Sequence, residues 1–183
     1  MVKVHDTIAE LIELEKAGFA TEAVQAYLAA TRIEPTSLRP YLNFQRTHYT
    51  RNLIYRTDGF ELLAICWNVG QAAPIHDHED QRCWARVEQG TLRFTNFSLL
   101  SESPLCLEQV GPSVRGGPGH LDALAGIHRV ENDPSFGQRA VSLHLYSRPF
   151  PECTIYDLTR CKRRRRRLRY DTVPASMGCR AAG

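Results

Sequence analysis

Residues 70–90 read GQAAPIHDHEDQRCWARVEQG, and two histidines within them, His76 and His78, are separated by one residue. On a β-strand, alternate side chains point to the same face, so these two imidazoles can chelate one metal ion. Two histidines alone would hold a metal weakly, and we expect a further ligand from a distant strand. The candidate is His128 in the segment GIHRVEN. Three ligands leave open positions at the metal, which is typical of a catalytic site.

The spacing of this stretch resembles the first motif of the cupin superfamily, in which two glycines enclose an H-x-H pair and a metal-binding glutamate. Gly70 and Gly90 occupy the glycine positions. Cys83 stands where most cupins have the glutamate. Without that resemblance, an H-x-H pair would be interpreted as ordinary polar strand residues, and the flanking glycines favour metal binding instead.

The second cupin motif is kept only in part. His128 and Asn132 have the expected separation, but Gly126 is one residue too close to the histidine and the proline is missing. With the cysteine in place of glutamate, three further segments make the chain similar to the thiol dioxygenases, and among them the cysteine dioxygenases. These segments are YTRN at 49–52, HRVEN at 128–132 and SLHLYS at 142–147. The resemblance covers roughly residues 5–160.

The resemblance implies one ferrous ion per chain, with L-cysteine and dioxygen as substrates and cysteine sulfinic acid as product. The ligand types alone do not select the metal, because neutral histidines without a carboxylate suit zinc, copper, nickel or ferrous iron. Two other functions stay open. One is the oxidation of 3-mercaptopropionate or another thiol, and the other is a non-catalytic cupin that binds or regulates.

Arg51, in the segment YTRNLIYR, is the candidate for substrate binding. A solvated strand arginine is the ordinary alternative, but a planar guanidinium matches a carboxylate bidentately. The resemblance implies that Arg51 binds the substrate carboxylate with Tyr49 beside it. Related enzymes that act on 3-mercaptopropionate carry glutamine at this position, so the arginine favours cysteine. The pocket wall is expected to include Ile65, Trp67 and Cys153.

Three polar residues, Ser142, His144 and Tyr146, share one face of a predicted strand that is otherwise apolar. Burying them is costly unless they bond to one another or to a site. The resemblance implies that they form a hydrogen-bonded row leading to the metal, with His144 also near the substrate. It also implies catalytic roles for these three residues and Cys83.

The resemblance further implies a thioether between the Cys83 sulfur and the Tyr146 ring, which would act as a protein-derived cofactor. Taken singly, Cys83 could be a small apolar core residue, and Tyr146 could be a strand aromatic with a satisfied hydroxyl. The remaining histidines, His5, His48 and His120, are interpreted as solvated or structural.

The pattern of the chain predicts a mainly β fold, a small antiparallel cupin or jelly-roll barrel with N-terminal helices. At 183 residues the chain is expected to form a single domain, 1–183. Its parts are a helical part at about 6–45, the barrel at about 49–160 and a basic segment at 161–183. Strands are predicted at 49–56, 61–69, 82–88, 91–99, 127–131, 139–147 and 153–158. Gln89 and Gly90 are predicted to form a hairpin between two of them, and residues 111–120 an exposed loop.

Composition and cysteine spacing indicate the class of protein and its cellular compartment. Hydrophobic residues make up 43% and charged residues 23% of the sequence, as in ordinary globular proteins. No apolar run approaches the roughly 20 residues of a membrane span, so no membrane contact is expected. The N-terminal stretch carries acidic residues, unlike a secretory signal, so we expect a cytoplasmic protein, and we expect a monomer. The cysteines show no C-x-x-C pair and are interpreted as free thiols. They are Cys66, Cys83, Cys106, Cys153, Cys161 and Cys179.

The C-terminal segment is strongly basic. From Cys161 onward there are eight basic residues and one acidic residue, and Arg163 to Arg167 are consecutive. The rest of the chain is therefore net acidic, although the whole carries +3. Five arginines can bind nucleic acid through its phosphates. A solvated strand edge or a disordered end is the favoured interpretation, because the enzyme family does not need the run.

Overall fold

The computed structural model describes residues 1–123 and 126–175, so Cys179 and Arg180 lie outside the described residues. The N-terminal part contains α1 (Val4–Lys16), α2 (Thr21–Ala30), α3 (Pro35–Leu38) and the 3-10 turn η1 (Arg39–Tyr41). The helical N-terminal part predicted at about 6–45 is confirmed, and its two longer helices are separated near Gly18. In the described part of the chain, no helix is long and apolar enough to cross a membrane.

The rest of the chain forms two sheets in which all strand pairs are antiparallel. The first has the order β1 (Thr50–Arg56), β2 (Glu61–Trp67), β10 (Ala140–Tyr146), β4 (Cys83–Gln89) and β8 (Leu121–Ala123). The second has the order β12 (Lys162–Arg167), β11 (Glu152–Asp157), β3 (Ile75–His76), β9 (Ile127–Glu131), β5 (Leu92–Glu102) and β6 (Leu105–Gln109), with β7 (Val114–Gly116) on β5. A short 3-10 turn, η2 (Pro134–Phe136), precedes β10.

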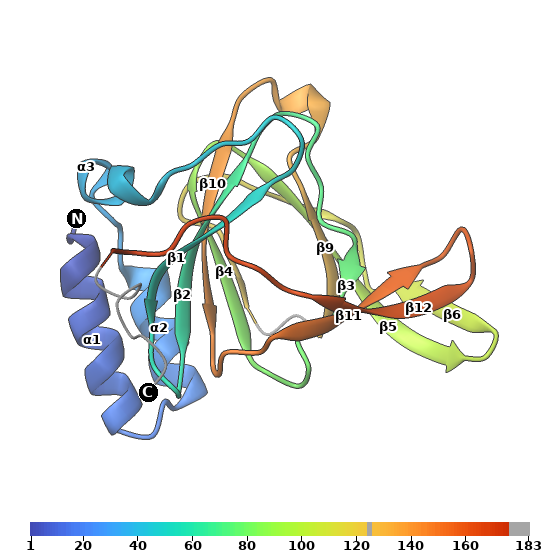
Figure 1. Ribbon diagram of the computed structural model, residues 1–183, viewed down its shortest axis with the longest axis horizontal. Coiled ribbons are helices and arrows are strands. Elements are labelled where there is room, and N and C mark those ends of the chain that lie inside the picture. Colours follow the sequence, from blue (N-terminus) through green and yellow to red (C-terminus); the bar gives the residue numbers. More distant parts are fainter. Residues whose placement is uncertain (124–125, 176–183) are drawn as a thin grey trace.

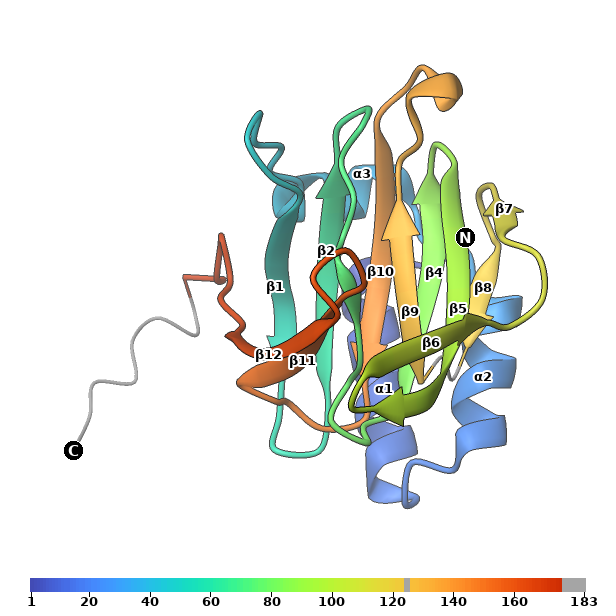
Figure 2. The same cartoon turned by 90° about the vertical axis from the view of Figure 1, so that its right-hand side faces the viewer.

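The layers are helix, sheet and sheet. Helices α1 and α2 lie along the outer face of the first sheet, and strands of the second sheet lie on its other side (Figure 1). Figure 2, which looks onto the second sheet, shows β11 and β12 crossing in front of the long strands of the first. This is the mainly β, cupin-type barrel with N-terminal helices that the sequence predicts.

Two apolar clusters fill the spaces between these layers, and β2 contributes to both because its side chains alternate. One face packs against the helices with Leu62, Ala64 and Cys66. The other face packs inside the barrel with Leu63, Ile65 and Trp67. Strand β10 alternates in the same way, with Val141, Leu143 and Leu145 in the helix-side cluster. Its polar residues Ser142, His144 and Tyr146 therefore face the barrel interior.

Two local predictions are wrong. The turn at Gln89 and Gly90 is no hairpin, because it joins β4 of the first sheet to β5 of the second. Gly90 has φ +71° there, and an added Cβ would lie 2.3 Å from the backbone oxygen of Arg139, so glycine is required. The predicted loop at 111–120 contains β7. The close approach of the two sheets, which the local sequence does not reveal, explains both errors.

The basic segment begins as a strand edge. Strand β12 pairs along its length with β11, and all six of its residues are exposed. Residues 168–173, here called the C-terminal strap, then run back over the first sheet. The backbone N–H of Asp171 donates to the oxygen of Arg51 at 2.8 Å, and that of Leu53 donates to the oxygen of Thr172 at 2.9 Å. These two hydrogen bonds attach the C-terminal strap to β1.

Candidate active site

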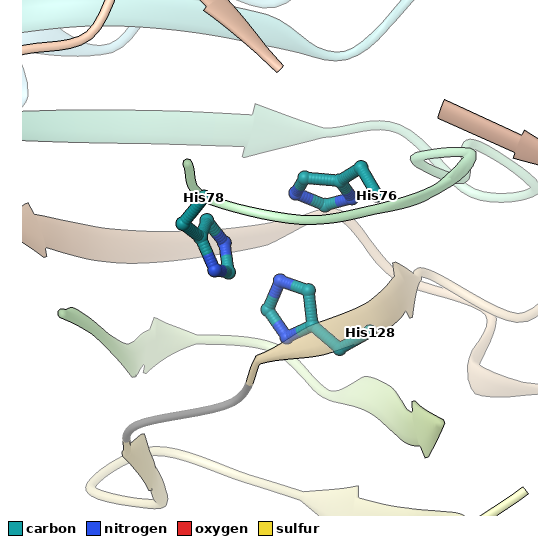
Figure 3. A group of neighbouring side chains, drawn as sticks. All are labelled: His76, His78 and His128. Carbon is teal, nitrogen blue, oxygen red and sulfur yellow. The ribbon is translucent and has the colours of Figure 1, made fainter. Parts of the chain in front are cut away.

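Three histidines gather inside the barrel. His76 ends β3 and pairs in register with His128 of β9, whereas His78 lies two residues beyond the end of β3. The shared strand face predicted for His76 and His78 is therefore incorrect in detail, because the strand is too short. Their ligand atoms and that of His128 nevertheless lie within 4.8 Å of one another. Figure 3 shows the three rings pointing toward a common space.

In two of the three rings, a hydrogen bond to Nδ1 determines that Nε2 is the nitrogen left to bind a metal. Nδ1 of His76 bonds the backbone oxygen of Pro74 at 2.9 Å, and Nδ1 of His128 bonds Oδ2 of Asp122 at 3.2 Å. Both acceptors are oxygens, so each Nδ1 carries the proton and each Nε2 keeps its lone pair. Nε2 of His128 is buried and has no hydrogen-bond partner, which is the arrangement that a metal ligand requires.

His76 is neutral at physiological pH, because burial lowers its pKa to about 3 and the neighbouring His128 adds to the effect. Neutral imidazoles are the form that binds metals, and the three-histidine set leaves further coordination positions for ligands. The donor set therefore fits a catalytic divalent metal. Asp122 was not predicted from the sequence, since its position on β8 follows no motif.

A chain of hydrogen bonds leads from the core toward this centre. Nε1 of Trp67 donates to Oγ of Ser142 at 3.0 Å, and Oγ lies 3.0 Å from Nε2 of His144. Nδ1 of His144 then lies 3.2 Å from the Tyr146 hydroxyl. Because an indole N–H can only donate, Oγ of Ser142 accepts from Trp67. Which atom donates in the two bonds of His144 depends on the tautomer of its ring.

Burial sets the protonation of the two ring groups in this row. Burial lowers the pKa of His144 well below its usual value, with a further contribution from the nearby His128. Burial also raises the pKa of Tyr146 well above its usual value, so the phenol keeps its proton. The hydrogen-bonded row predicted from the sequence is thus present and is extended by Trp67. It ends on the protonated hydroxyl of Tyr146, and the ring centroids of Tyr146 and His78 lie 5.6 Å apart.

Cys83 is the direct cross-strand partner of Tyr146 in the pairing of β4 with β10. Both side chains are about 1% exposed, and the thiol hydrogen-bonds the phenol. Burial raises the pKa of Cys83 far above its usual range, so the thiol is protonated. Two reactive groups are thus held in contact next to the histidines.

Arg51 enters the site from β1, where its guanidinium carbon lies 5.7 Å from the centre of the Tyr146 ring. Nη2 of Arg51 lies 3.5 Å from Oε1 of Glu61, a carboxylate that is only 1% exposed. Although burial disfavours its charge, Tyr146 and Glu61 raise the pKa of Arg51, so the guanidinium is fully charged. Tyr170 of the C-terminal strap donates a short hydrogen bond to Oε2 of Glu61.

Glu61 and Tyr170 were not predicted from the sequence. A sequence feature could have indicated Glu61: it is the one charged residue of the apolar strand ELLAICW, whose residues are all buried. Burial raises the pKa of Glu61 against the opposing effects of Tyr170 and Arg51. Glu61 does not line the pocket, and its oxygen 3.5 Å from Nη2 of Arg51 makes it the nearest counter-charge to that guanidinium among the described residues. Tyr170 gives no such signal, because the strap has no strand pattern.

A small pocket joins the histidines to Arg51. It is lined by Tyr49, Arg51, Pro74, His76, His78, Tyr146, Phe150, Cys153, Ile155, Arg166 and Leu168. Of the predicted wall, only Cys153 lines it. Ile65 lies in the barrel core, and Trp67 lies behind Tyr49, with their rings stacked at 4.6 Å. Phe150, which packs edge-on against Tyr146 at 5.0 Å, and Arg166 were missed.

The fold and the three-histidine centre define a cupin-type metalloenzyme. The family model for cysteine dioxygenase type I matches residues 1–159. The chain belongs to the cysteine dioxygenase type I family, and it is a dioxygenase of that family.

Its relatives support this assignment over most of the chain. Cysteine dioxygenase type 1 of Homo sapiens is 37% identical over 161 residues, which are 82% of this chain and 79% of the relative. The protein of the same name from Danio rerio is 33% identical over 165 residues, 83% of this chain and 80% of the relative. Among solved structures, TT1209 from Thermus thermophilus aligns with a TM-score of 0.47 at 14% identity, over 61% of this chain and 93% of that chain.

Proposed function

We propose that this chain adds both atoms of dioxygen to the sulfur of L-cysteine, giving cysteine sulfinic acid, with one ferrous ion held by His76, His78 and His128. The observation that carries the proposal is the single small pocket that joins two of these histidines to the Arg51 guanidinium. A metal at one end and a cation at the other match a thiol and a carboxylate in one small molecule. Bound ferrous iron would supply the redox chemistry between dioxygen and sulfur.

Arg51 binds and orients the substrate carboxylate in this proposal. Its guanidinium is charged, 11% exposed and held from behind by Glu61, so it enters the pocket with its orientation fixed. A preorganised guanidinium loses little freedom on binding, and a bidentate pair selects a planar carboxylate. Tyr49, stacked on Trp67, forms the adjacent wall.

Tyr146 supplies a hydroxyl proton to the site in this proposal. His144 bonds its hydroxyl at 3.2 Å and is itself bonded to Ser142 at 3.0 Å, so the position of the phenol oxygen is fixed. In the tautomer in which Nδ1 of His144 donates, the phenol proton can be donated to an oxygen of the substrate or of dioxygen. Ser142 and His144 act through Tyr146 as positioning residues.

We also propose that Cys83 and Tyr146 form a thioether. A bond forms between the Cys83 sulfur and a ring carbon of Tyr146, while the S–H and C–H bonds break. The two electrons and two protons released reduce one dioxygen to hydrogen peroxide, which balances the step. The support is the direct cross-strand contact of two buried groups beside the metal centre. The bond would fix the phenol in the position described above.

The setting of the enzyme is also a proposal, in which the whole chain acts as one cytoplasmic domain and as a monomer. The five cysteines in the described residues are free thiols, which is the usual state in a reducing compartment. We propose no nucleic-acid partner for the arginine run, because Arg163 and Arg165 are paired with Glu102 and Glu79 of the same chain.

The test is metal analysis combined with oxygen uptake. The protein loaded with ferrous iron should consume one dioxygen per cysteine and yield the sulfinate, whereas the zinc-loaded protein should be inactive. His128→Ala should lose both iron and turnover, with the exposed His5→Ala as the control. Full iron occupancy in His128→Ala would contradict the ligand assignment. Faster turnover of 3-mercaptopropionate than of cysteine would move the proposal to the related thiol dioxygenases.

A further inference from the structure

The pocket that contains Arg51 continues into an outer cavity, here called the vestibule. The two cavities share the side chains of Tyr49, Arg51, Arg166 and Leu168. The vestibule is lined by His48, Tyr49, Arg51, Arg166, Arg167, Leu168, Arg169 and Asp171. A molecule in the pocket would therefore meet the vestibule at Arg166.

The register of β11 with β12 directs Arg166 to this place. Arg166 is the cross-strand partner of Cys153, which is buried and lines the pocket. Opposed residues in an antiparallel pair project from the same face, so Arg166 extends over the pocket mouth. The preceding residue, Arg165, projects from the other face of β12 and forms ion pairs with Glu79 and Glu152.

The vestibule has an excess of positive charge. Its only carboxylate among the described residues is Asp171, and both oxygens are engaged. Oδ1 lies 2.7 Å from Nε2 of His48, and Oδ2 accepts the backbone N–H of Arg51 at 2.8 Å. The guanidinium of Arg166 makes no hydrogen bond or ion pair with any described residue. Burial raises the pKa of Tyr49, and the charges of Arg51 and Arg166 oppose that rise, so both cations act on the same wall.

We propose that Arg166 forms an anion-binding subsite in the vestibule, which selects thiol substrates carrying a second anionic group beyond the carboxylate held by Arg51. The inference rests on the proposed function for the thiol and the first carboxylate, and adds a substrate class. Neighbouring arginines Arg167 and Arg169 raise the local potential, and Arg166 makes the direct contact. Two cations that line the same pocket suit a dicarboxylate thiol, because each carboxylate gains its own charge-assisted hydrogen bonds.

Two thiols form a matched pair for the test. 3-Mercaptopropionate has one carboxylate, and mercaptosuccinate is the same molecule with a second carboxylate. Dissociation constants are measured by calorimetry on the iron-loaded protein without oxygen, with each mercaptosuccinate enantiomer separately. In the unmodified protein the better enantiomer should bind about tenfold more tightly than 3-mercaptopropionate. Added salt should reduce this ratio, since the vestibule is open to solvent.

The variants are Arg166→Gln, Arg166→Lys and Arg164→Gln. Arg164→Gln is the matched control, because Arg164 lies on the same strand face but lines neither the pocket nor the vestibule. Arg166→Gln should bring the ratio of dissociation constants to about one, and Arg166→Lys should keep part of it. Arg164→Gln should leave it unchanged. A ratio near one in the unmodified protein, or one that survives Arg166→Gln, would overturn the subsite.

Inorganic phosphate separates this inference from the proposed function, because it contains no thiol. Phosphate binding that is lost in Arg166→Gln but kept in Arg164→Gln supports the anion site even if neither thiol binds, and oxygen uptake with L-cysteine then decides the proposed function separately. If both thiols bind equally and phosphate binding does not depend on Arg166, the subsite is wrong and the proposed function stands.

Discussion

Cys83 and Tyr146 face each other directly across strands β4 and β10, and both are buried beside the three-histidine centre. The register of the two strands fixes this opposition, and the hydrogen bonds of His144 fix the phenol oxygen. The thiol and the phenol ring are therefore placed to react with each other, and both are shielded from solvent.

Incubation with iron, cysteine and oxygen should join Cys83 to Tyr146. Peptide mass spectrometry should find the two segments linked with the loss of two hydrogens, in a form that resists thiol reductants. Cys83→Ser should retain partial activity, while Tyr146→Phe should lose more because it removes the hydroxyl itself. If Cys83 can still be alkylated completely after many turnovers, no link forms.

Asp122 should set the affinity for the metal without binding it. Its carboxylate orients His128 through Nδ1 at 3.2 Å, and losing such a partner typically weakens metal binding by about 10- to 100-fold. Asp122→Ala should show this loss in a competition titration with a chelator, and Asp122→Asn a smaller one, because the amide oxygen still accepts. The exposed Asp58→Ala is the control. Unchanged affinity in Asp122→Ala would show that His128 is oriented by packing alone.

Arg51 should be needed for substrates that carry a carboxylate. Removing one partner of a buried charge pair costs about 2–5 kcal/mol, so Arg51→Gln should lower kcat/KM for cysteine by well over tenfold. Cysteamine, which lacks the carboxylate, should lose far less. The double variant Arg51→Gln with Glu61→Gln controls for folding, because it does not leave Glu61 buried without its cation. Equal losses on both substrates in that double variant would make Arg51 structural.

Glu88 should make the protein less stable as the pH rises. Burial raises the pKa of Glu88 to about 7, although Arg86 at 3.2 Å opposes the effect. A carboxyl group whose folded pKa is raised contributes stability that is complete below its unfolded pKa, near 4.5, and is lost as the pH rises through about 7. The loss should reach up to about 3 kcal/mol.

Urea unfolding between pH 5 and pH 8 tests this prediction. Glu88→Gln, which resembles the protonated group, should become increasingly more stable than the unmodified protein across that range. The exposed Glu10→Gln should keep the same pH profile as the unmodified protein. Parallel profiles for Glu88→Gln and the unmodified protein would show that the carboxyl titrates normally.

Much of the site could be predicted from the sequence, because its residues follow local rules. The candidate ligands His76, His78 and His128 were identified from motif spacings that resemble those of the cupins, and the row on β10 follows from the two-residue period of a strand. The helices and most strands follow from hydrophobic periodicity in the same way. These features depend on near neighbours in the chain, so the amino-acid sequence alone determines them.

The tertiary structure decided what lies around those residues. Asp122, Glu61, Tyr170 and Arg166 reach the site from β8, β2, the C-terminal strap and β12, and no spacing relates them to the histidines. Their positions depend on strand order, on the register of β11 with β12 and on the strap returning to β1. Contacts between residues so distant in the chain form only when the sheets close around the core, which is why the sequence indicated the three candidate histidines but not these four residues around them.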